Sequence, residues 1–372
     1  MLRLAFRNLF QSRARLLISV GGVGLALLLI LTLDAIFSGV EQQVTAYIDH
    51  SGADVFVSQS GVRNMHMAAS SLPVTTIDEV RAIPGVESVT PILYLTNMVV
   101  VGDNRRLAYV IGLPEDAASG KPWRNVQGRD VPREGEAIIE SYLGEVLGVG
   151  VGDKVKILGQ EFTIAGLSAG ATNIVNSLAF ISLGDFMRMR GTSEAVSFLL
   201  VKAAPGQAPE ALAARIEANV PLVSAMTREA FAQQERKVVK DMSTDVIAIM
   251  NLVGFLIGLA VMALTVYTAT LSRRAEYGVL KAVGARNGDL YRVVLAQALY
   301  SVGLGLATGV ALTVALSLVV PSFISNLALQ VSAASLAKVA GASLVLAALS
   351  AVLPIRQMAA LDPAAVFRRK VR

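Results

Sequence analysis

The residue types that most often do chemistry are scarce in this sequence. It has no cysteine and two histidines, His50 and His66, and neither histidine has the spacing of a catalytic triad or a zinc site. We therefore expect no catalytic residue, no metal site and no cofactor. One run, Met65-His66-Met67, carries thioether and imidazole groups able to bind copper or haem. The alternative, which we favour, is a polar loop that contains two methionines by chance.

Nucleotide-binding chemistry is missing as well. The single Gly-Lys pair, Gly120-Lys121, is followed by Pro122 and lacks the upstream glycine of a G-x-x-x-x-G-K-[ST] loop. If ATP drives this protein, the ATP must therefore be bound by another polypeptide.

The composition is typical of a membrane protein. Of the 372 residues, 54% are hydrophobic and 16% are charged, and the mean hydropathy is +0.58. Soluble chains carry about 25% charged residues. Four apolar runs are long enough to cross about 30 Å of hydrocarbon, at residues 16–37, 246–271, 293–320 and 336–354. A signal peptide is the alternative for the first run, but its apolar core exceeds the usual length of about 7–15 residues, which favours an uncleaved anchor.

Lysine and arginine indicate how these spans are oriented. They gather in residues 1–15, an amphipathic segment, and in 272–292 and 355–372, whereas 321–335 has none. The positive-inside rule makes the three basic segments cytoplasmic and puts 38–245 and 321–335 outside. The net charge of +5 thus reports topology, and we expect no nucleic-acid binding. We expect the protein in the inner (cytoplasmic) membrane.

The outside segment 38–245 has the pattern of a mixed α/β domain. Strands are predicted at 54–58, 98–101 and 154–158, with a hairpin turn at Gly159-Gln160 before a strand at 161–165. Helices are predicted at residues 76–82, 137–147 and 209–218.

Helical spacing also continues beyond two of the spans. Val44 and Ile48 extend it past the first span, and Phe231 and Val238 carry it into the second. These residues predict a paired helical stalk that carries the outside domain. Two unconnected amphipathic flanks are the alternative.

The loop after the second span predicts a short amphipathic helix, at residues 273–285. Gly284 is a stop signal at its end. Apolar residues at near-helical spacing stand beside charged ones, namely Val279, Leu280, Val283, Glu276 and Lys281.

Small and polar residues inside the spans suggest close helix packing. Gly254 with Gly258, and Gly305 with Gly309, form small-xxx-small faces. Either packing within one chain or contact between two copies would use them. The main polar candidates in the spans are Asn251, Gln297 and Thr265, which is poor material for a hydrophilic pathway.

Three stretches together resemble the MacB (macrolide-exporter) and FtsX-like family of ABC transporter permeases, and the resemblance covers nearly the whole chain. The first is RRAEYGVLKAVGA at 273–285. The second is the set IPGVESVTP at 83–91, LGVGVGDKV at 147–155 and FTIAGL at 162–167, and the third is the proline-containing tail at 354–368.

The resemblance implies an integral membrane α-helical fold of four transmembrane helices, one plus three, with an extracytoplasmic mixed α/β domain on a stalk. It implies a permease-only subunit that works with two copies of a separate ATPase, a second permease copy and membrane lipids, while a periplasmic adaptor is left open. The 273–285 helix would dock on the ATPase through Glu276, Gly278, Leu280 and Lys281, with Gly284 ending it. The alternative is a helix that lies flat on anionic lipid through its basic residues.

By the same resemblance, this mechanically coupled transporter would export or extract a hydrophobic or amphipathic substrate. A lipoprotein, haem, a peptide, a glycolipid or a drug would each fit. One alternative is an FtsX-like signalling permease that activates a cell-wall hydrolase, and another is a membrane-anchored enzyme or receptor with no ATPase.

Overall fold

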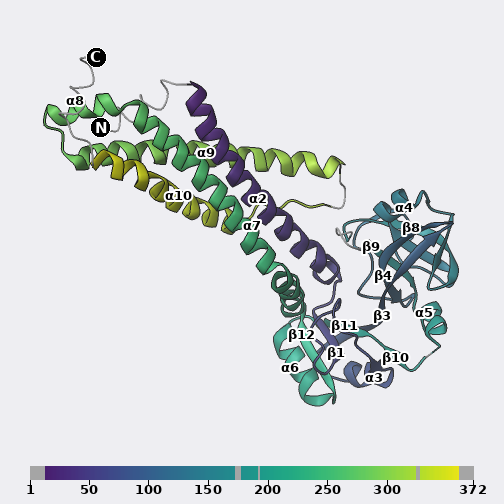
Figure 1. Ribbon diagram of the computed structural model, residues 1–372. Coiled ribbons are helices and arrows are strands. Elements are labelled where there is room, and N and C mark those ends of the chain that lie inside the picture. Colours follow the sequence, from purple (N-terminus) through teal and green to yellow (C-terminus); the bar gives the residue numbers. More distant parts are fainter. Residues whose placement is uncertain (1–12, 172–176, 192, 324–326, 360–372) are drawn as a thin grey trace. The chain divides into compact units, whose positions relative to one another are not determined.

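A computed structural model describes residues 13–171, 177–191, 193–323 and 327–359 (Figure 1). The chain forms two compact units. One is helical and includes Ser243–Phe323 together with the chain up to Ser38 and from Leu329 onward, and the other includes Gly39–Met242 and Ile324–Ala328.

Four long helices are apolar enough to cross a membrane. They are α2 (Arg13–His50), α7 (Arg228–Ser272), α9 (Asn287–Phe323) and α10 (Ala333–Ala359). At about 1.5 Å per residue, even α10 is long enough to cross the hydrocarbon layer. The four expected spans are therefore present, and the helices run beyond the apolar stretches that predicted them.

Small residues bring the spans together within this one chain. A Cβ atom added to Gly305 of α9 would lie 2.7 Å from Val23 Cγ1 of α2, and one added to Gly258 of α7 would lie 3.1 Å from Ala26 Cβ. Gly254 and Gly309 also face α2. The two small-xxx-small faces thus serve packing inside the helical unit.

Charged residues near the ends of the spans also connect neighbouring helices. Lys338 of α10 donates to Asp34 Oδ1 of α2 at 3.0 Å. The last helix does not end at Pro354 as its apolar run does, because α10 continues through that proline to Ala359.

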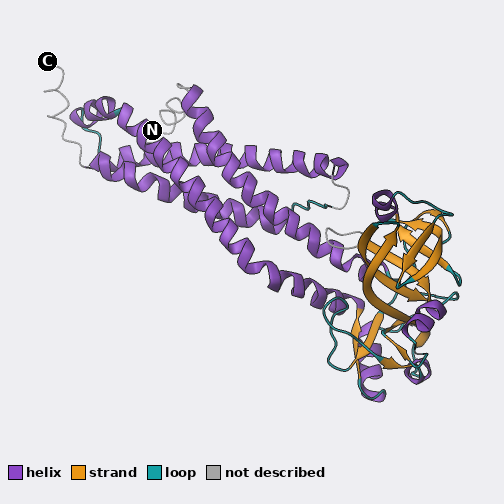
Figure 2. Cartoon of the chain, turned by 45° about the vertical axis from the view of Figure 1, so that its right-hand side comes forward, coloured by secondary structure: helices purple, strands orange, loops and turns teal. Residues whose placement is uncertain are grey.

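The other unit is built on a ten-stranded sheet with the order β12-β1-β11-β3-β4-β9-β6-β8-β5, to which β7 adds through β3 and β8. Figure 2 shows the strands of this unit in orange. The strands up to β6 are β1 (Val55–Gln59), β2 (Leu72–Pro73), β3 (Val86–Val101), β4 (Asn104–Leu113), β5 (Asn125–Gly128) and β6 (Glu136–Glu140). The rest are β7 (Lys154–Ile157), β8 (Gln160–Ser168), β9 (Ser177–Ser182), β10 (Ala195–Val196), β11 (Phe198–Ala203) and β12 (Val223–Thr227). Of these strands, β2 and β10 pair with each other in a separate two-stranded sheet.

Part of this sheet closes on itself. β3 pairs with β4, the path continues through β9, β6 and β8, and β7 joins β8 back to β3. The remaining part, β12-β1-β11 with the start of β3, stays open. β3 belongs to both parts because it is 16 residues long.

Alternation along the strands divides the core in the way a pleated sheet requires. In β1, Phe56 faces a cluster that contains Tyr47 of α2 and Phe231 of α7, whereas Val55 and Val57 face a second cluster. The helices α3 (Thr75–Arg81) and α6 (Pro209–Asn219) cover that second cluster. A third cluster fills the closed part, beside α4 (Ser141–Leu147) and α5 (Leu183–Arg190).

Two sequence predictions for this domain were wrong in detail. The hairpin turn falls at Leu158-Gly159, one residue earlier than expected, because Ile157 pairs with Gln160 and both turn residues have positive φ. Residues 137–147 are not one helix. Their first part is strand β6, in which Ile138 and Ile139 face opposite clusters, and only Ser141–Leu147 is helical.

The paired stalk is confirmed by contacts between α2 and α7. Arg236 of α7 donates to Thr45 Oγ1 of α2 at 3.2 Å and lies 3.5 Å from Asp49 Oδ2. Each of these helices is also one of the four apolar helices, so the domain begins and ends on spans without an intervening loop.

Candidate functional site

The loop between the second and third long helices folds as a separate short helix. α8 (Arg274–Ala282) follows α7 after a single residue, Arg273. After α8, Gly284 has φ +104° and its N–H donates to Lys281 O at 3.0 Å, while Ala285 N–H donates to Leu280 O at 2.9 Å. This is the pattern of a glycine that ends a helix. The predicted helix and its stop at Gly284 are therefore confirmed.

One face of α8 is fixed to the helical unit. Tyr277 is 1% exposed and belongs to the buried cluster that also holds Leu290 and Val294 of α9. Gly278 is buried, and Leu280 packs against the same cluster. Burial of a large aromatic side chain stabilises a fold by about 1.5–3 kcal/mol, so α8 is held firmly in its place.

Lys281 adds a polar attachment to this buried face. Its ammonium group donates to Met358 O at 3.2 Å and to Ala359 O at 3.4 Å, in the last turn of α10. A cation is favourable there because the carbonyl groups at the end of a helix carry partial negative charge. α8 is thus joined to α10 as well as to α9.

The opposite face of α8 is open. Glu276, Val279 and Val283 are exposed, at 64% for the Glu276 side chain and 46% and 83% for the two valines. Glu276 pairs with Arg273 Nη1 at 3.2 Å. The Arg273 side chain is only 12% exposed, so the carboxylate is the accessible member of this pair. The open face therefore offers one carboxylate next to two apolar side chains.

The structure divides the five residues singled out from the sequence. Glu276 and Gly284 lie on the exposed side, whereas Gly278, Leu280 and Lys281 face the bundle. Sequence reasoning missed Tyr277 as the anchor, although its spacing of three and four residues from Leu280 and Lys281 puts all three on one face. It also missed Met358, whose role as an acceptor leaves no mark in the sequence.

The Met65-His66-Met67 run has a defined setting in the other unit. His66 Nδ1 lies 2.6 Å from Glu235 Oε1, and Met65 N–H donates to Glu235 Oε2 at 2.7 Å. Glu235 belongs to α7 and its side chain is 1% exposed. Among the described residues no three histidine, cysteine, aspartate or glutamate side chains gather in a way that would hold a metal ion. The contacts of this run tie a loop to a helix.

Two family models match this chain. The MacB-like periplasmic core domain matches residues 16–219, and the FtsX-like permease C-terminal model matches residues 248–363. Together they take in most of the chain, and the second includes α8.

Known proteins of similar sequence are named as ABC transporter permeases. The chain is 24% identical over 371 residues to one from Mycobacterium tuberculosis, with 99% of each chain covered. It is 22% identical over 370 residues to one from Mycobacterium bovis, again with 99% of each covered. A third, from Methanocaldococcus jannaschii, is 22% identical over 322 residues, which cover 79% of this chain and 77% of the relative.

Two solved structures resemble part of the chain. The periplasmic region of MacB from Actinobacillus actinomycetemcomitans gives a TM-score of 0.38 at 14% identity, covering 49% of this chain and 94% of that one. The extracellular domain of the noncanonic ABC-type transporter YknZ from Gram-positive bacteria gives 0.37 at 12% identity, covering 47% and 98%.

Proposed function

This chain belongs to the MacB- and FtsX-like family of ABC transporter permeases, and from that membership we propose that a separate ATPase drives it to export or extract a hydrophobic or amphipathic molecule. The ATPase would dock on α8, and the long helices would pass its movement to the extracytoplasmic domain.

The observation that carries this proposal is the two-sided construction of α8. Its buried side is fixed by Tyr277 and by the bond from Lys281 to α10. Its open side presents Glu276 between exposed apolar residues. A partner that pushes on the open side would move the bundle, because the buried side leaves α8 little freedom to shift alone. Gly278, Leu280 and Lys281 would act by holding α8 in position, and Glu276 would touch the ATPase.

The continuity of α7 supports mechanical transmission. Its 45 residues run from Arg228 to Ser272 without a break, and α8 begins two residues later. The first turns of α7 pack into the extracytoplasmic domain, where Phe231 stacks on Phe56 with ring centroids 4.8 Å apart. A displacement at α8 would therefore act on that domain through a single helix.

The interior of the helical unit favours a substrate that does not pass between the spans. Every described polar side chain buried there is a hydroxyl or an amide, such as Gln297 and Thr313. The Thr313 hydroxyl donates to Gly309 O of its own helix at 2.8 Å, and that of Thr265 donates to Val261 O at 2.7 Å. A hydrophilic route would need a row of ionisable groups, whereas the buried polar atoms without a described hydrogen-bond partner in this unit are hydroxyl or amide oxygens, such as Thr32 Oγ1 and Asn251 Oδ1. We propose that the substrate enters from the outer leaflet or the extracytoplasmic space.

The working assembly that we propose has two permease chains and two ATPase chains in the inner membrane. One chain supplies one α8, and an ATPase sandwich has two halves. Lipid would cover exposed apolar residues of the spans such as Leu17, Leu264 and Leu318.

The test is to purify the tagged full chain with its ATPase and to measure both composition and work. We expect a two-plus-two complex by native mass spectrometry and ATP-dependent removal of an amphipathic substrate from vesicles. A one-plus-one complex with full ATP turnover would exclude the dimer. If ATP turnover responds to a cell-wall hydrolase and no amphiphile is moved, the function is signalling and not transport.

A further inference from the structure

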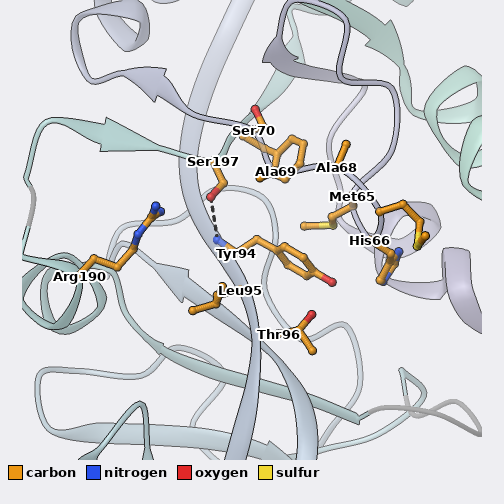
Figure 3. Close-up of a pocket in the computed structure, with 12 residues that line it drawn as sticks. Met65, His66, Ala68, Ala69, Ser70, Tyr94, Leu95, Thr96, Arg190 and Ser197 are labelled. Carbon is orange, nitrogen blue, oxygen red and sulfur yellow. Dashed lines mark hydrogen bonds between the residues drawn. The ribbon is translucent and has the colours of Figure 1, made fainter.

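The extracytoplasmic domain contains a pocket of about 240 Å³ between the segment 65–70 and strand β3 (Figure 3). The pocket lies within a single unit of the chain. Its volume is that of roughly eight water molecules at about 30 Å³ each, which suits a small molecule or one end of a longer one. The lining residues used below are Met65, His66, Tyr94, Leu95, Arg190 and Phe198.

One side of the pocket is rigid and polar. His66 is held by Glu235 as described above, and the Tyr94 ring meets the His66 ring edge-on, with centroids 5.8 Å apart. The Tyr94 hydroxyl is buried and lies near the Thr96 side chain, which also lines the pocket (Figure 3), but it makes no hydrogen bond of normal geometry with a described residue. Burial raises the pKa of Tyr94 far above its usual range, so the hydroxyl keeps its proton and can donate it in a hydrogen bond. Burying a donor without a partner is unfavourable, and an acceptor on a ligand would remove that cost.

The other side carries a positive charge. Arg190, at the end of α5, lies across the pocket from His66 in Figure 3. Its neighbour Arg188 pairs with Glu134 Oε1 at 3.0 Å, whereas Arg190 makes no ion pair with any described residue. The guanidinium group is exposed and is therefore available to an anion.

Apolar side chains line the space between these two sides. Met65 is 2% exposed, Phe198 is 1% exposed, and Leu95 is 39% exposed although it is a large aliphatic residue. A pocket with apolar walls, one cation and one unused donor matches a molecule with an apolar chain, one acidic group and one further acceptor.

We infer that this pocket binds a small anionic amphiphile of the acylated-acid type. Its acidic group pairs with Arg190, and its chain lies against Met65, Leu95 and Phe198. Its carbonyl oxygen accepts from Tyr94. The further step of calling this pocket the transporter's substrate site rests on the proposed function. Binding of the amphiphile itself requires no ATPase.

The probe for this site is octanoylglycine, which has one carboxylate, one amide carbonyl and a short chain. Isothermal titration calorimetry on the full chain in phosphatidylcholine nanodiscs should show one saturable site. Arg190→Gln should weaken binding by roughly 10- to 100-fold, and Tyr94→Phe by roughly 2- to 10-fold. Arg105→Gln, which removes the same charge from an exposed position of β4 outside the pocket, should leave binding unchanged.

Control titrations distinguish binding in the pocket from nonspecific partition into lipid. Octylamine, with the opposite charge, should not bind at the saturable site. Octanoate lacks the amide carbonyl, so Tyr94→Phe should not alter its weaker binding. Repeating the titration in phosphatidylglycerol nanodiscs distinguishes a bilayer lipid as the natural source, if affinity falls by competition, from a soluble amphiphile, if it does not.

Equal affinity of the wild type and Arg190→Gln, with unchanged thermal unfolding midpoints, would overturn the inference. Equal binding of octylamine would do the same. Because no nucleotide or partner is present, either result would leave the proposed coupling to an ATPase untouched.

Discussion

The Lys281 ammonium nitrogen lies 3.2 Å from the Met358 carbonyl oxygen, across 77 residues of sequence. This contact joins the short helix α8 to the last turn of α10, while Tyr277 joins α8 to the cluster that contains α9 residues. A helix between two spans is thereby connected to a third.

The first prediction concerns this attachment. Lys281→Met keeps the apolar stem and removes the donor, so α8 should loosen by about 1.5–3 kcal/mol, the range for a hydrogen bond to a charged group. Hydrogen–deuterium exchange of the peptide 274–282 should become faster. Lys281→Arg retains a donor and should exchange at nearly the wild-type rate. Identical exchange in all three proteins would show that Lys281 does not hold α8.

The second prediction uses two glycines of α9 that are two residues apart. In Gly305→Leu the new side chain would collide with Val23 and with the backbone of Gly24. Overpacking of this kind costs about 1–3 kcal/mol, and the thermal unfolding midpoint of the detergent-solubilised chain should fall. Gly303→Leu is the control, because a Cβ atom there meets nothing within 4 Å. Equal unfolding midpoints for the two variants would contradict close packing of α9 against α2 at Gly305.

The third prediction concerns Glu235, which holds both Met65 N–H and His66. Glu235→Ala leaves these groups without their acceptor, at about 1–3 kcal/mol for a buried unsatisfied donor. Exchange of backbone amides in residues 60–71 should accelerate. Lys237→Ala, an exposed position two residues further along α7, should have no such effect. Protection in 60–71 that survives Glu235→Ala would show that the loop is held by other contacts.

The fourth prediction tests the orientation of the chain. Cysteines are placed in this cysteine-free sequence at Asp103, in the exposed β3–β4 turn, and at Asn287, at the exposed start of α9. In intact cells an impermeant maleimide should label Asp103→Cys and not Asn287→Cys. After permeabilisation both should react. Labelling of Asn287→Cys in intact cells would contradict the assignment of α8 to the cytoplasm.

The parts of the structure that could be predicted from sequence depend on local pattern. Apolar length sets the four long helices, and Gly284 marks the end of α8 because a residue at φ +104° strongly favours glycine. The turn at 158–159 was misplaced because it requires Leu158 at φ 53°, which a sequence rule would assign to the glycine alone. The segment 137–147 was predicted as one helix, yet pairing with β8 and β9 makes its first four residues part of a strand.

The parts that could not be predicted depend on contacts between distant residues. Closure of the sheet requires Val99 and Val100 of β3 to pair with Ile157 and Lys156 of β7, and nothing near either strand indicates it. The periodicity of 273–285 shows that α8 has two faces, but it does not show which face meets the bundle. Burial of Tyr277 decides that question and leaves Glu276 outward.

The central claim is that the open face of α8 binds an ATPase, and Glu276 is the residue through which to test it. Its replacement should leave the fold intact, because the Glu276 side chain is 64% exposed and Arg273, whose side chain is 12% exposed, has a further interaction besides this pair. If Glu276 instead pairs with a basic group in the partner, its loss should cost about 2–5 kcal/mol of binding free energy. A helix that rests on anionic lipid would gain attraction from an added positive charge.

The most direct measurement is recovery of the ATPase with the full-length permease, comparing wild type, Glu276→Lys and Asp103→Lys at equal membrane expression. Asp103→Lys makes the same charge change in the exposed β3–β4 turn. We expect Glu276→Lys to lose the ATPase while wild type and Asp103→Lys retain it. Undiminished recovery and transport-linked ATP turnover with Glu276→Lys would contradict the coupling role of α8.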